Sequence, residues 1–352
     1  MLHRFATFVA ACTVLLILAG SLVTSHGAGL SVPDWPTSYG WNMFTFPPSM
    51  WVANIFYEHG HRLVASGVGM LTIVLAAWLW VAEPRAWVRR LGLAALGAII
   101  AQGLLGGLTV LFFLPAPIST AHAALAEIFF CLVVSIALFT SPGWMEGDTP
   151  VAGQVDAAAA PGLRRLATTT TLVVYAQILV GAAMRHTGAG LAIPDFPLAF
   201  GALVPPRWDP KIAVHFAHRV GALLVASAVL ATAVRVRRRA PARADLTRPA
   251  GLAAALVALQ LLLGASNVLS RLNPWINSLH VVGGALVLAT SLVLTLRTWR
   301  EVFDPIARRP GKPSVAAGTP AVDLHQRASA PDGARPMVVA TNGLRADRGA
   351  GA

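Results

Sequence analysis

Long apolar stretches alternate with polar connections along most of this 352-residue chain. Eight of them have the length of about 20 residues that a helix needs to cross the hydrocarbon core of a bilayer. They cover residues 5–24, 61–82, 91–114, 119–140, 166–184, 214–234, 250–269 and 276–296. The pattern predicts an all-α integral membrane protein with eight transmembrane helices. We expect the first stretch to be retained, because it is long for a signal peptide and leads into a motif that returns later.

The composition agrees with this prediction. Hydrophobic residues make up 56% of the chain and charged residues 12%, whereas soluble domains carry about 25% charged residues. A soluble enzyme is therefore excluded. The net charge of +12 comes from basic residues between the apolar stretches and near the C-terminus, which suits contact with lipid headgroups and predicts no nucleic-acid partner. Cys12 and Cys131 lie in different stretches, so neither a disulfide framework nor a thiolate metal site is expected.

Arginine is distributed unevenly between alternate connections. Arg4, the 85–90 connection, the 235–248 connection and Arg297 lie on one side, whereas 25–57 and 115–118 contain no basic residue. The positive-inside rule therefore predicts a multi-pass protein of the cell inner (plasma) membrane with both termini in the cytoplasm. The long loops 25–60 and 185–213 would then face outward.

The chain contains an internal repeat. The segment Gly-Ala-Gly-Leu-Ser-Val-Pro-Asp-Trp-Pro at 27–36 returns as Gly-Ala-Gly-Leu-Ala-Ile-Pro-Asp-Phe-Pro at 188–197, 161 residues later. The dipeptide His61-Arg62 returns after 157 residues as His218-Arg219, and His122 returns after 158 residues as His280. One register shared by several landmarks indicates a duplicated unit. We therefore expect two tandem four-helix bundles, related by a pseudo-twofold axis along the membrane normal.

This duplication gives the expected domain boundaries. The N-terminal bundle covers 1–140, a cytoplasmic linker covers 141–165, and the C-terminal bundle covers 166–300. Residues 301–352 are rich in Ala, Gly, Pro and Arg without an apolar period, which predicts a disordered cytoplasmic tail.

Four of the ten histidines recur in the repeat register: His61 and His122 in the first half, and His218 and His280 in the second. Each lies near the outer start of a predicted helix, so each half places two imidazoles at one depth. Such a pair can bind the iron of a haem from both sides, and an ionisable residue inside a span is a candidate for function. The simpler interpretation is an interfacial cap or an interhelical hydrogen bond. Zinc is a weaker alternative, because no Cys or Asp accompanies both pairs.

Glycines cluster near these histidines, and they would either make room for a flat macrocycle or serve ordinary helix packing. They are Gly60, Gly67, Gly69, Gly106, Gly107, Gly221, Gly264, Gly283 and Gly284.

The two halves of the repeat differ in their acidic residues. Glu58 lies three residues before His61, on the same helix face, whereas the second half has His215 there. A carboxylate beside a metal-bound ring could move protons, although a helix N-terminus also favours an acid. Glu127 lies in the fourth stretch, five residues past His122, and is expected to point elsewhere. For Asp34 and Asp195 we favour a helix-capping role over a catalytic one.

At these residues the chain resembles the heme A synthase family. The resemblance rests on the Gly-Leu-Ser-Val-Pro-Asp-Trp-Pro loop, Glu58-x-x-His61-Arg62, His122, His215-Phe-x-His218-Arg219 and His280, and spans about 10–295. It implies oxidation of a methyl group of haem O to a formyl group through successive hydroxylations, giving haem A. His218 and His280 would hold the iron of a haem B that relays electrons. His61 and His122 would bind the substrate haem, with Glu58 as the catalytic residue.

The resemblance also implies partners: haem O synthase (protohaem farnesyltransferase), cytochrome c oxidase assembly, an unidentified electron donor and membrane lipid, with a homo-oligomer left open. Many bacterial members carry a cysteine pair in the first outer loop, and here that loop contains none, so a mechanism that needs a loop thiol is excluded. Two other classes compete with the enzyme. A di-haem electron carrier of cytochrome b type would have two permanent haems, and a small-molecule transporter would have none.

Overall fold

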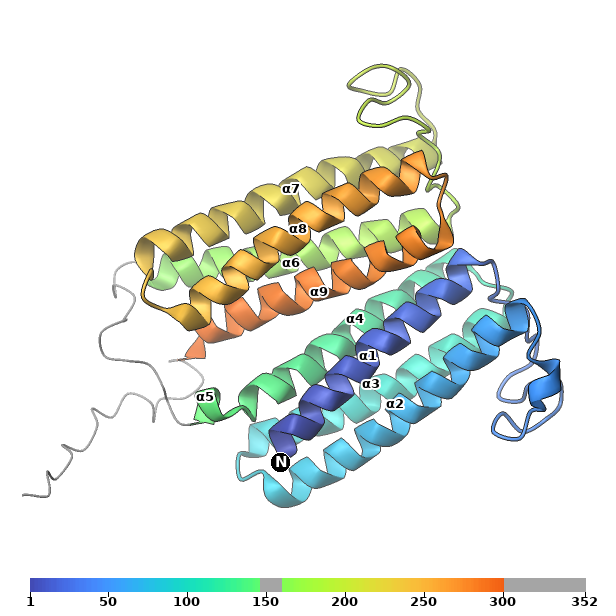
Figure 1. Cartoon of the computed structure of the whole chain (residues 1–352), viewed down its shortest axis with the longest axis horizontal. Coiled ribbons are helices and arrows are strands. Elements are labelled where there is room, and N and C mark those ends of the chain that lie inside the picture. Colours follow the sequence, from blue (N-terminus) through green and yellow to red (C-terminus); the bar gives the residue numbers. More distant parts are fainter. Residues whose placement is uncertain (146–159, 301–352) are drawn as a thin grey trace, which may run out of the picture. The chain divides into compact units, whose positions relative to one another are not determined.

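The computed structural model describes residues 1–145 and 160–300, which form one helical unit (Figure 1). Eight of its helices are long and apolar enough to cross a membrane. They are α1 (Leu2–Ser25), α2 (Asn54–Ala82), α3 (Ala86–Leu111), α4 (Ala116–Phe139), α6 (Ala160–His186), α7 (Pro210–Arg239), α8 (Ala244–Leu269) and α9 (Pro274–Thr298). A single turn, α5 (Pro142–Met145), follows α4, and a short 3₁₀ helix, η1, covers Pro48–Met50. The described residues contain no strand, so the predicted all-α membrane class is confirmed.

Several helices begin before the apolar stretch that predicts them. The α2 helix starts at Asn54 rather than 61, and α7 starts at Pro210 rather than 214. The first turns of both helices contain polar residues, which a hydropathy pattern assigns to the loop. Side-chain caps explain two of the starts: Asp209 accepts hydrogen bonds from the N–H groups of Lys211 and Ile212, and Asn273 accepts them from Trp275 and Ile276. Such caps satisfy N–H groups that have no partner inside the helix.

The helices form two groups of four (Figure 1). Within the first, α1 packs on α2 and α4, and α3 on α2 and α4; within the second, α6 packs on α7 and α9, and α8 on α7 and α9. Helices α1 and α4 of the first group contact α9 and α6 of the second. This arrangement is consistent with the predicted tandem bundles.

The predicted linker, 141–165, is helical at both of its described ends, because α5 starts at Pro142 and α6 already starts at Ala160. Its middle and the predicted tail, 301–352, lie outside the described residues.

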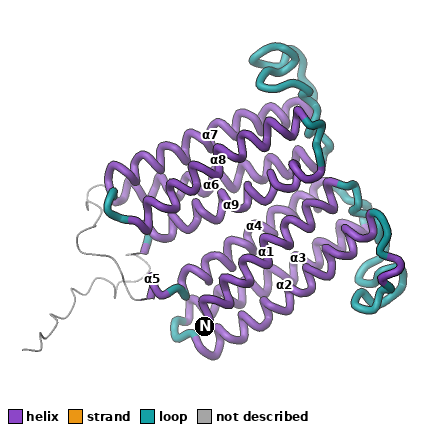
Figure 2. The backbone as a smooth tube through the Cα atoms, in the orientation of Figure 1, coloured by secondary structure: helices purple, strands orange, loops and turns teal. Residues whose placement is uncertain are grey.

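The long segments 26–53 and 187–209 lie at the same end of the helices (Figure 2), which we call the loop end. Each contains an isolated antiparallel bridge, Ser38 with Trp41 and Ala199 with Ala202. The two bridges are 161 residues apart, the offset of the sequence repeat. The duplication therefore extends into the loop conformation.

Candidate functional site: two histidine pairs in a duplicated bundle

The four repeated histidines lie on α2, α4, α7 and α9, about two turns from the loop end of each helix. His61 is seven residues after the start of α2 and His218 is eight after the start of α7. His122 and His280 are each six residues after the start of their helix. The two histidines of each half therefore lie at similar depths, as the sequence predicts. Both lie about one helical turn farther from the loop end than expected.

In the first half, each ring packs against a glycine of a neighbouring helix. A Cβ atom at Gly20 of α1 would lie 2.8 Å from Cε1 of His61. A Cβ atom at Gly106 of α3 would lie 3.1 Å from Cε1 of His122. Any larger residue would push these rings away, so the glycines fix where the rings lie.

The second half repeats both contacts. A Cβ atom at Gly181 of α6 would lie 2.9 Å from Cε1 of His218, and one at Gly264 of α8 would lie 3.4 Å from Cε1 of His280. Of the four glycines, the sequence analysis singled out Gly106 and Gly264 and missed Gly20 and Gly181. The repeat register would have revealed them, because 20 and 181 also differ by 161.

The rings of His218 and His280 face each other with centroids 6.3 Å apart and planes inclined at 76°. A metal lies about 2 Å from an imidazole nitrogen, which is itself roughly 1 Å from the ring centroid, so two ligands on opposite sides of one ion have centroids about 6 Å apart. This pair therefore fits a single metal ion between its rings. His61 and His122 are near enough to interact electrostatically.

The nitrogen atoms of the four rings differ in their surroundings. The Nδ1 atoms of His61, His122 and His280 are buried and make no hydrogen bond to a described residue. The main chains of Gln102 and Gln260 lie close to the rings of His122 and His280, respectively, but do not form hydrogen bonds with them. The Nε2 atom of every ring lacks a hydrogen bond to the described residues and is not sealed by protein atoms. The atom free to bind a metal is thus Nε2 in each case.

His218 has a polar partner that His61 lacks. The side-chain amide nitrogen of Gln177 on α6 lies 3.0 Å from Nδ1 of His218 and donates to the His218 carbonyl oxygen at 2.7 Å. The amide occupies space that a Cβ at Gly221 would fill. In the repeat register, Gln177 and Gly221 correspond to Leu16 and Val64. The Gln177 contact is therefore specific to the second half, whereas in the first half the Gln102 amide donates to the carbonyl oxygen of His122 at 2.9 Å.

Glu58 does not face an open site. One carboxylate oxygen accepts from the N–H of Val32 at 2.8 Å, and the other from Arg62 at 2.7 Å. In the second half, the N–H of Ile193 lies 3.3 Å from Nδ1 of His215. Both side chains therefore hold the outer loop of their own half.

The arginine of each His-Arg motif binds that loop as well. The Arg62 guanidinium donates to the carbonyl oxygens of Val32, Asp34 and Thr37 at 2.7–3.0 Å. Arg219 donates to three loop carbonyls at 2.7–3.2 Å. In each motif the histidine side chain therefore lies inside the bundle, and the arginine that follows it binds the outer loop through hydrogen bonds.

The expected helix-capping role of Asp34 and Asp195 is wrong. Asp34 accepts from the N–H groups of Tyr39 and Gly40, inside its own loop, and Asp195 does the same with Phe200 and Gly201. Burial raises the pKa of Asp34, but the hydrogen bonds from Gly40, Thr37 and Tyr39 outweigh it and leave the pKa below its ordinary value. Hydrogen bonds from Gly201 and Phe200 lower the pKa of Asp195.

The first outer loop packs against α3 through Trp35, next to the glycine that lies under His122. A Cβ atom at Gly107 would lie 2.5–2.8 Å from atoms of the Trp35 ring, and the preceding residue, Gly106, supports His122. The corresponding residues in the second half are Phe196 and Ala265, and Phe196 is exposed. No sequence pattern predicts this contact, because it joins two separate elements.

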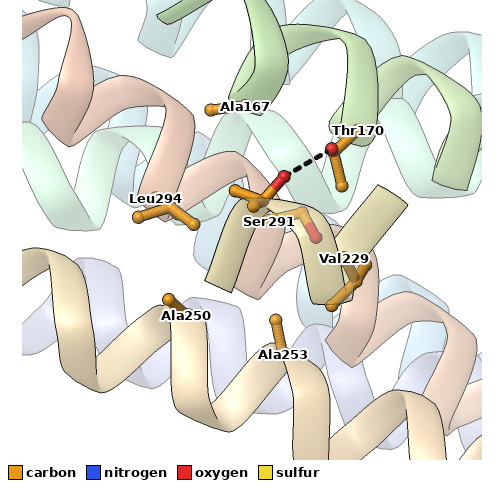
Figure 3. Close-up of a pocket in the computed structure, with 8 residues that line it drawn as sticks. Ala167, Thr170, Val229, Ala250, Ala253, Ser291 and Leu294 are labelled. Atoms are coloured by element: carbon orange, nitrogen blue, oxygen red, sulfur yellow. Dashed lines mark hydrogen bonds between the residues drawn. The ribbon is translucent and has the colours of Figure 1, made fainter. Parts of the chain in front are cut away.

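Two further features lie away from the histidines. Glu127 is buried, with one carboxylate oxygen that lacks a hydrogen bond to any described residue, and interacts with Cys131 and Tyr175. A small pocket between α6, α7, α8 and α9 contains a hydrogen bond between Thr170 and Thr232 (Figure 3). Thr170 is eleven residues from Gly181, about 16 Å along the helix, so this pocket is not part of the histidine site.

Within the described residues, no cluster of three or more His, Cys, Asp or Glu side chains could hold a metal ion. A tetrahedral zinc site needs at least three protein ligands, so the zinc alternative finds no ligand set there. The fold and site define an integral membrane protein with paired, metal-competent histidines in a duplicated helical bundle.

Comparisons with known proteins identify the family within this class. A model of the family described as cytochrome oxidase assembly protein matches residues 3–292. A heme A synthase of Symbiobacterium thermophilum is 35% identical over 305 residues, covering 83% of this chain and 94% of that protein. A heme A synthase of Shouchella clausii is 30% identical, covering 84% and 94%. The chain belongs to the heme A synthase family, so the expected family and its oxidoreductase class are confirmed.

Proposed function

We propose that this protein oxidises a methyl group of haem O to a formyl group and so produces haem A. The observation that carries the proposal is the pair of opposed imidazoles, His218 and His280, whose 6.3 Å separation fits one iron atom, inside a chain of the heme A synthase family. Both rings keep Nε2 available and rest on glycine. These features match an iron porphyrin better than an interfacial cap.

The two halves would have different roles in the reaction. His218 and His280 would hold a haem B, which supplies one-electron transfer when bound. His61 and His122 would lie at the substrate haem. This assignment is supported by Gln177, which lies beside His218, and by Trp35, which packs the outer loop against α3 next to Gly106, the glycine under His122. A permanent cofactor benefits from a fixed ligand, and a substrate site benefits from a loop that can close.

Glu58 would serve the first half in two ways. Its carboxylate holds Val32 and Arg62, so it positions the outer loop above the substrate. It also lies one helical turn before His61 on the same helix face, and a carboxylate in this position would take up protons that the oxidation releases. A multi-electron oxidation of a methyl group also releases protons, so the site needs such a group.

The orientation in the membrane and the partners extend the proposal. Both termini would lie in the cytoplasm of a cell whose inner membrane holds the protein. Haem O would arrive from haem O synthase and haem A would pass to cytochrome c oxidase assembly, with electrons supplied by a separate donor. A reporter fused to each terminus tests the orientation: a signal from the outer side would contradict it.

Pigment extraction tests the enzyme directly. The full-length protein is expressed in cells that make haem O but no haem A, and the extracted haems are separated by chromatography. We expect haem A only in cells that contain the protein. An unchanged haem pool would overturn the proposal and favour the di-haem carrier, which the similar glycine–histidine contacts of the two halves also permit.

A further inference from the structure

Arg185 is a charged residue for which the proposed chemistry has no role. It lies in the last turn of α6 and its side chain crosses to α1. Its Nη1 atom donates to Ser21 Oγ at 2.9 Å, and Nη2 donates to the Ser21 carbonyl oxygen and to Ser25 Oγ, both at 2.7 Å. All three acceptors are neutral. The guanidinium therefore connects the halves without neutralising its charge.

The charge has no anionic partner among the described residues. No ion pair of Arg185 occurs there, and its Nε is buried without a hydrogen bond. A guanidinium carries five N–H donors, and the three contacts leave two of them unused. A buried cation at the membrane is costly unless an anion accompanies it. The C-terminal ends of α6 and of α1, where Ser21 and Ser25 lie, offset part of that cost, but neither end supplies a full negative charge.

The position of Arg185 relates it to the second histidine pair. It lies four residues after Gly181, the glycine under His218, so both share one face of α6 and Arg185 is about 6 Å closer to the loop end. It also interacts electrostatically with His280. Ser25, which accepts from Arg185, lies 3.0 Å from Ser278 on α9. The cation is thus held at the loop-end edge of the second pair.

The repeat shows that this cation belongs to one half only. In the repeat register Arg185 corresponds to Thr24, and its acceptor Ser21 corresponds to Ala182. A residue needed only for helix termination or membrane anchoring would be required equally in both halves. The counter-ion of Arg185 is therefore expected to be a ligand of the second half alone.

We propose that Arg185 is the anchor for a propionate carboxylate of the porphyrin whose iron lies between His218 and His280. This rests on the proposed function. Arginine binds carboxylates through charge-assisted hydrogen bonds, and the porphyrin of haem B carries two propionates at one edge. With the iron between the rings, an edge turned towards the loop end meets Arg185, whose unused donors and uncompensated charge a carboxylate satisfies.

Esterified haem tests the proposal. The full-length protein is purified in detergent without haem and titrated with ferric iron protoporphyrin IX or with its dimethyl ester, which lacks both negative charges. Loss of a hydrogen bond to a charged group reduces affinity by about tenfold or more. We expect the wild-type protein to prefer the free acid by that factor. Arg185→Met should bring the ratio of the affinities for free acid and ester close to one, while the bis-histidine absorbance spectrum persists. Arg185→Lys should keep part of the preference for the free acid.

Arg207→Met is the matched control, because Arg207 is exposed in the outer loop of the same half, and it should keep the full preference. Equal binding of acid and ester by the wild-type protein would overturn the proposal even if no variant folds. An undiminished preference in Arg185→Met would overturn it as well. Failure of the underlying function looks different: neither porphyrin would then give a bis-histidine spectrum with the wild-type protein.

Discussion

The first and second halves share a scaffold and differ in what touches the histidines. Both place two rings against glycines of neighbouring helices, and both clamp an outer loop with the arginine of a His-Arg motif. In the second half Gln177 supports His218 from inside the bundle. In the first half Trp35 of the outer loop packs against Gly107, next to the glycine under His122. The duplication thus kept the packing of histidines on glycines, whereas the contacts of Gln177 and Trp35 each occur in one half only.

The largest expected effect is loss of the cofactor from the second half. His218→Ala or His280→Ala would remove one of the two proposed iron ligands, and we expect almost no haem B to remain in the purified protein. The measurement is haem absorbance per mole of protein. His3→Ala is the control, since His3 lies at the far end of α1, beside the Ala137 carbonyl oxygen. Full retention of haem B in either axial variant would refute the assignment.

The next effect concerns chemistry in the first half. Glu58→Ala should lower haem A yield by about 10²–10⁴-fold, the usual loss when a proton-transfer group is removed, with haem B still bound. Glu58→Gln keeps an oxygen that can accept from Val32 but carries no exchangeable acidic proton, so its yield should also fall. The control is Glu127→Gln, which changes a buried acid of the same half. A normal haem A yield from Glu58→Gln would show that Glu58 has no role in proton transfer and serves only to hold the outer loop.

The sequence predicts more of the scaffold than of this asymmetry. Apolar length is enough to locate all eight helices, and a shared register is enough to pair His218 with His280. The early start of α2 was missed because its first turn is polar. Contacts such as Trp35 with Gly107, or Arg185 with Ser21, join elements whose packing no local pattern specifies. Asp34 was misassigned because its partners are N–H groups of the loop itself, and a Pro-Asp sequence is equally typical of a cap.

A smaller effect should follow from disturbing the loop. Gly107→Ala introduces a Cβ too close to the Trp35 ring, and overpacking of this kind costs about 1–3 kcal/mol. We expect roughly tenfold lower haem A yield with haem B unchanged. Gly103→Ala is a matched control one turn away on α3, because a Cβ there meets nothing within 4 Å. Equal yields from the two variants would show that Trp35 does not serve the first site.

The smallest effect should be on the properties of haem B rather than on its presence. If Nε2 of His218 binds iron, Nδ1 carries a proton and needs an acceptor. The Gln177 amide would supply one by exchanging its nitrogen for its oxygen beside Nδ1, at the expense of its hydrogen bond to the His218 carbonyl oxygen. An acceptor at this position makes the ring more basic and stabilises the oxidised metal. Gln177→Leu should therefore raise the reduction potential, by about 59 mV for each tenfold change in relative affinity for the two oxidation states. Gln102→Leu removes the glutamine beside His122 in the first half and should leave the reduction potential of haem B unchanged. An unaltered potential in Gln177→Leu would mean that the polar contact fixes the helix without tuning the ligand.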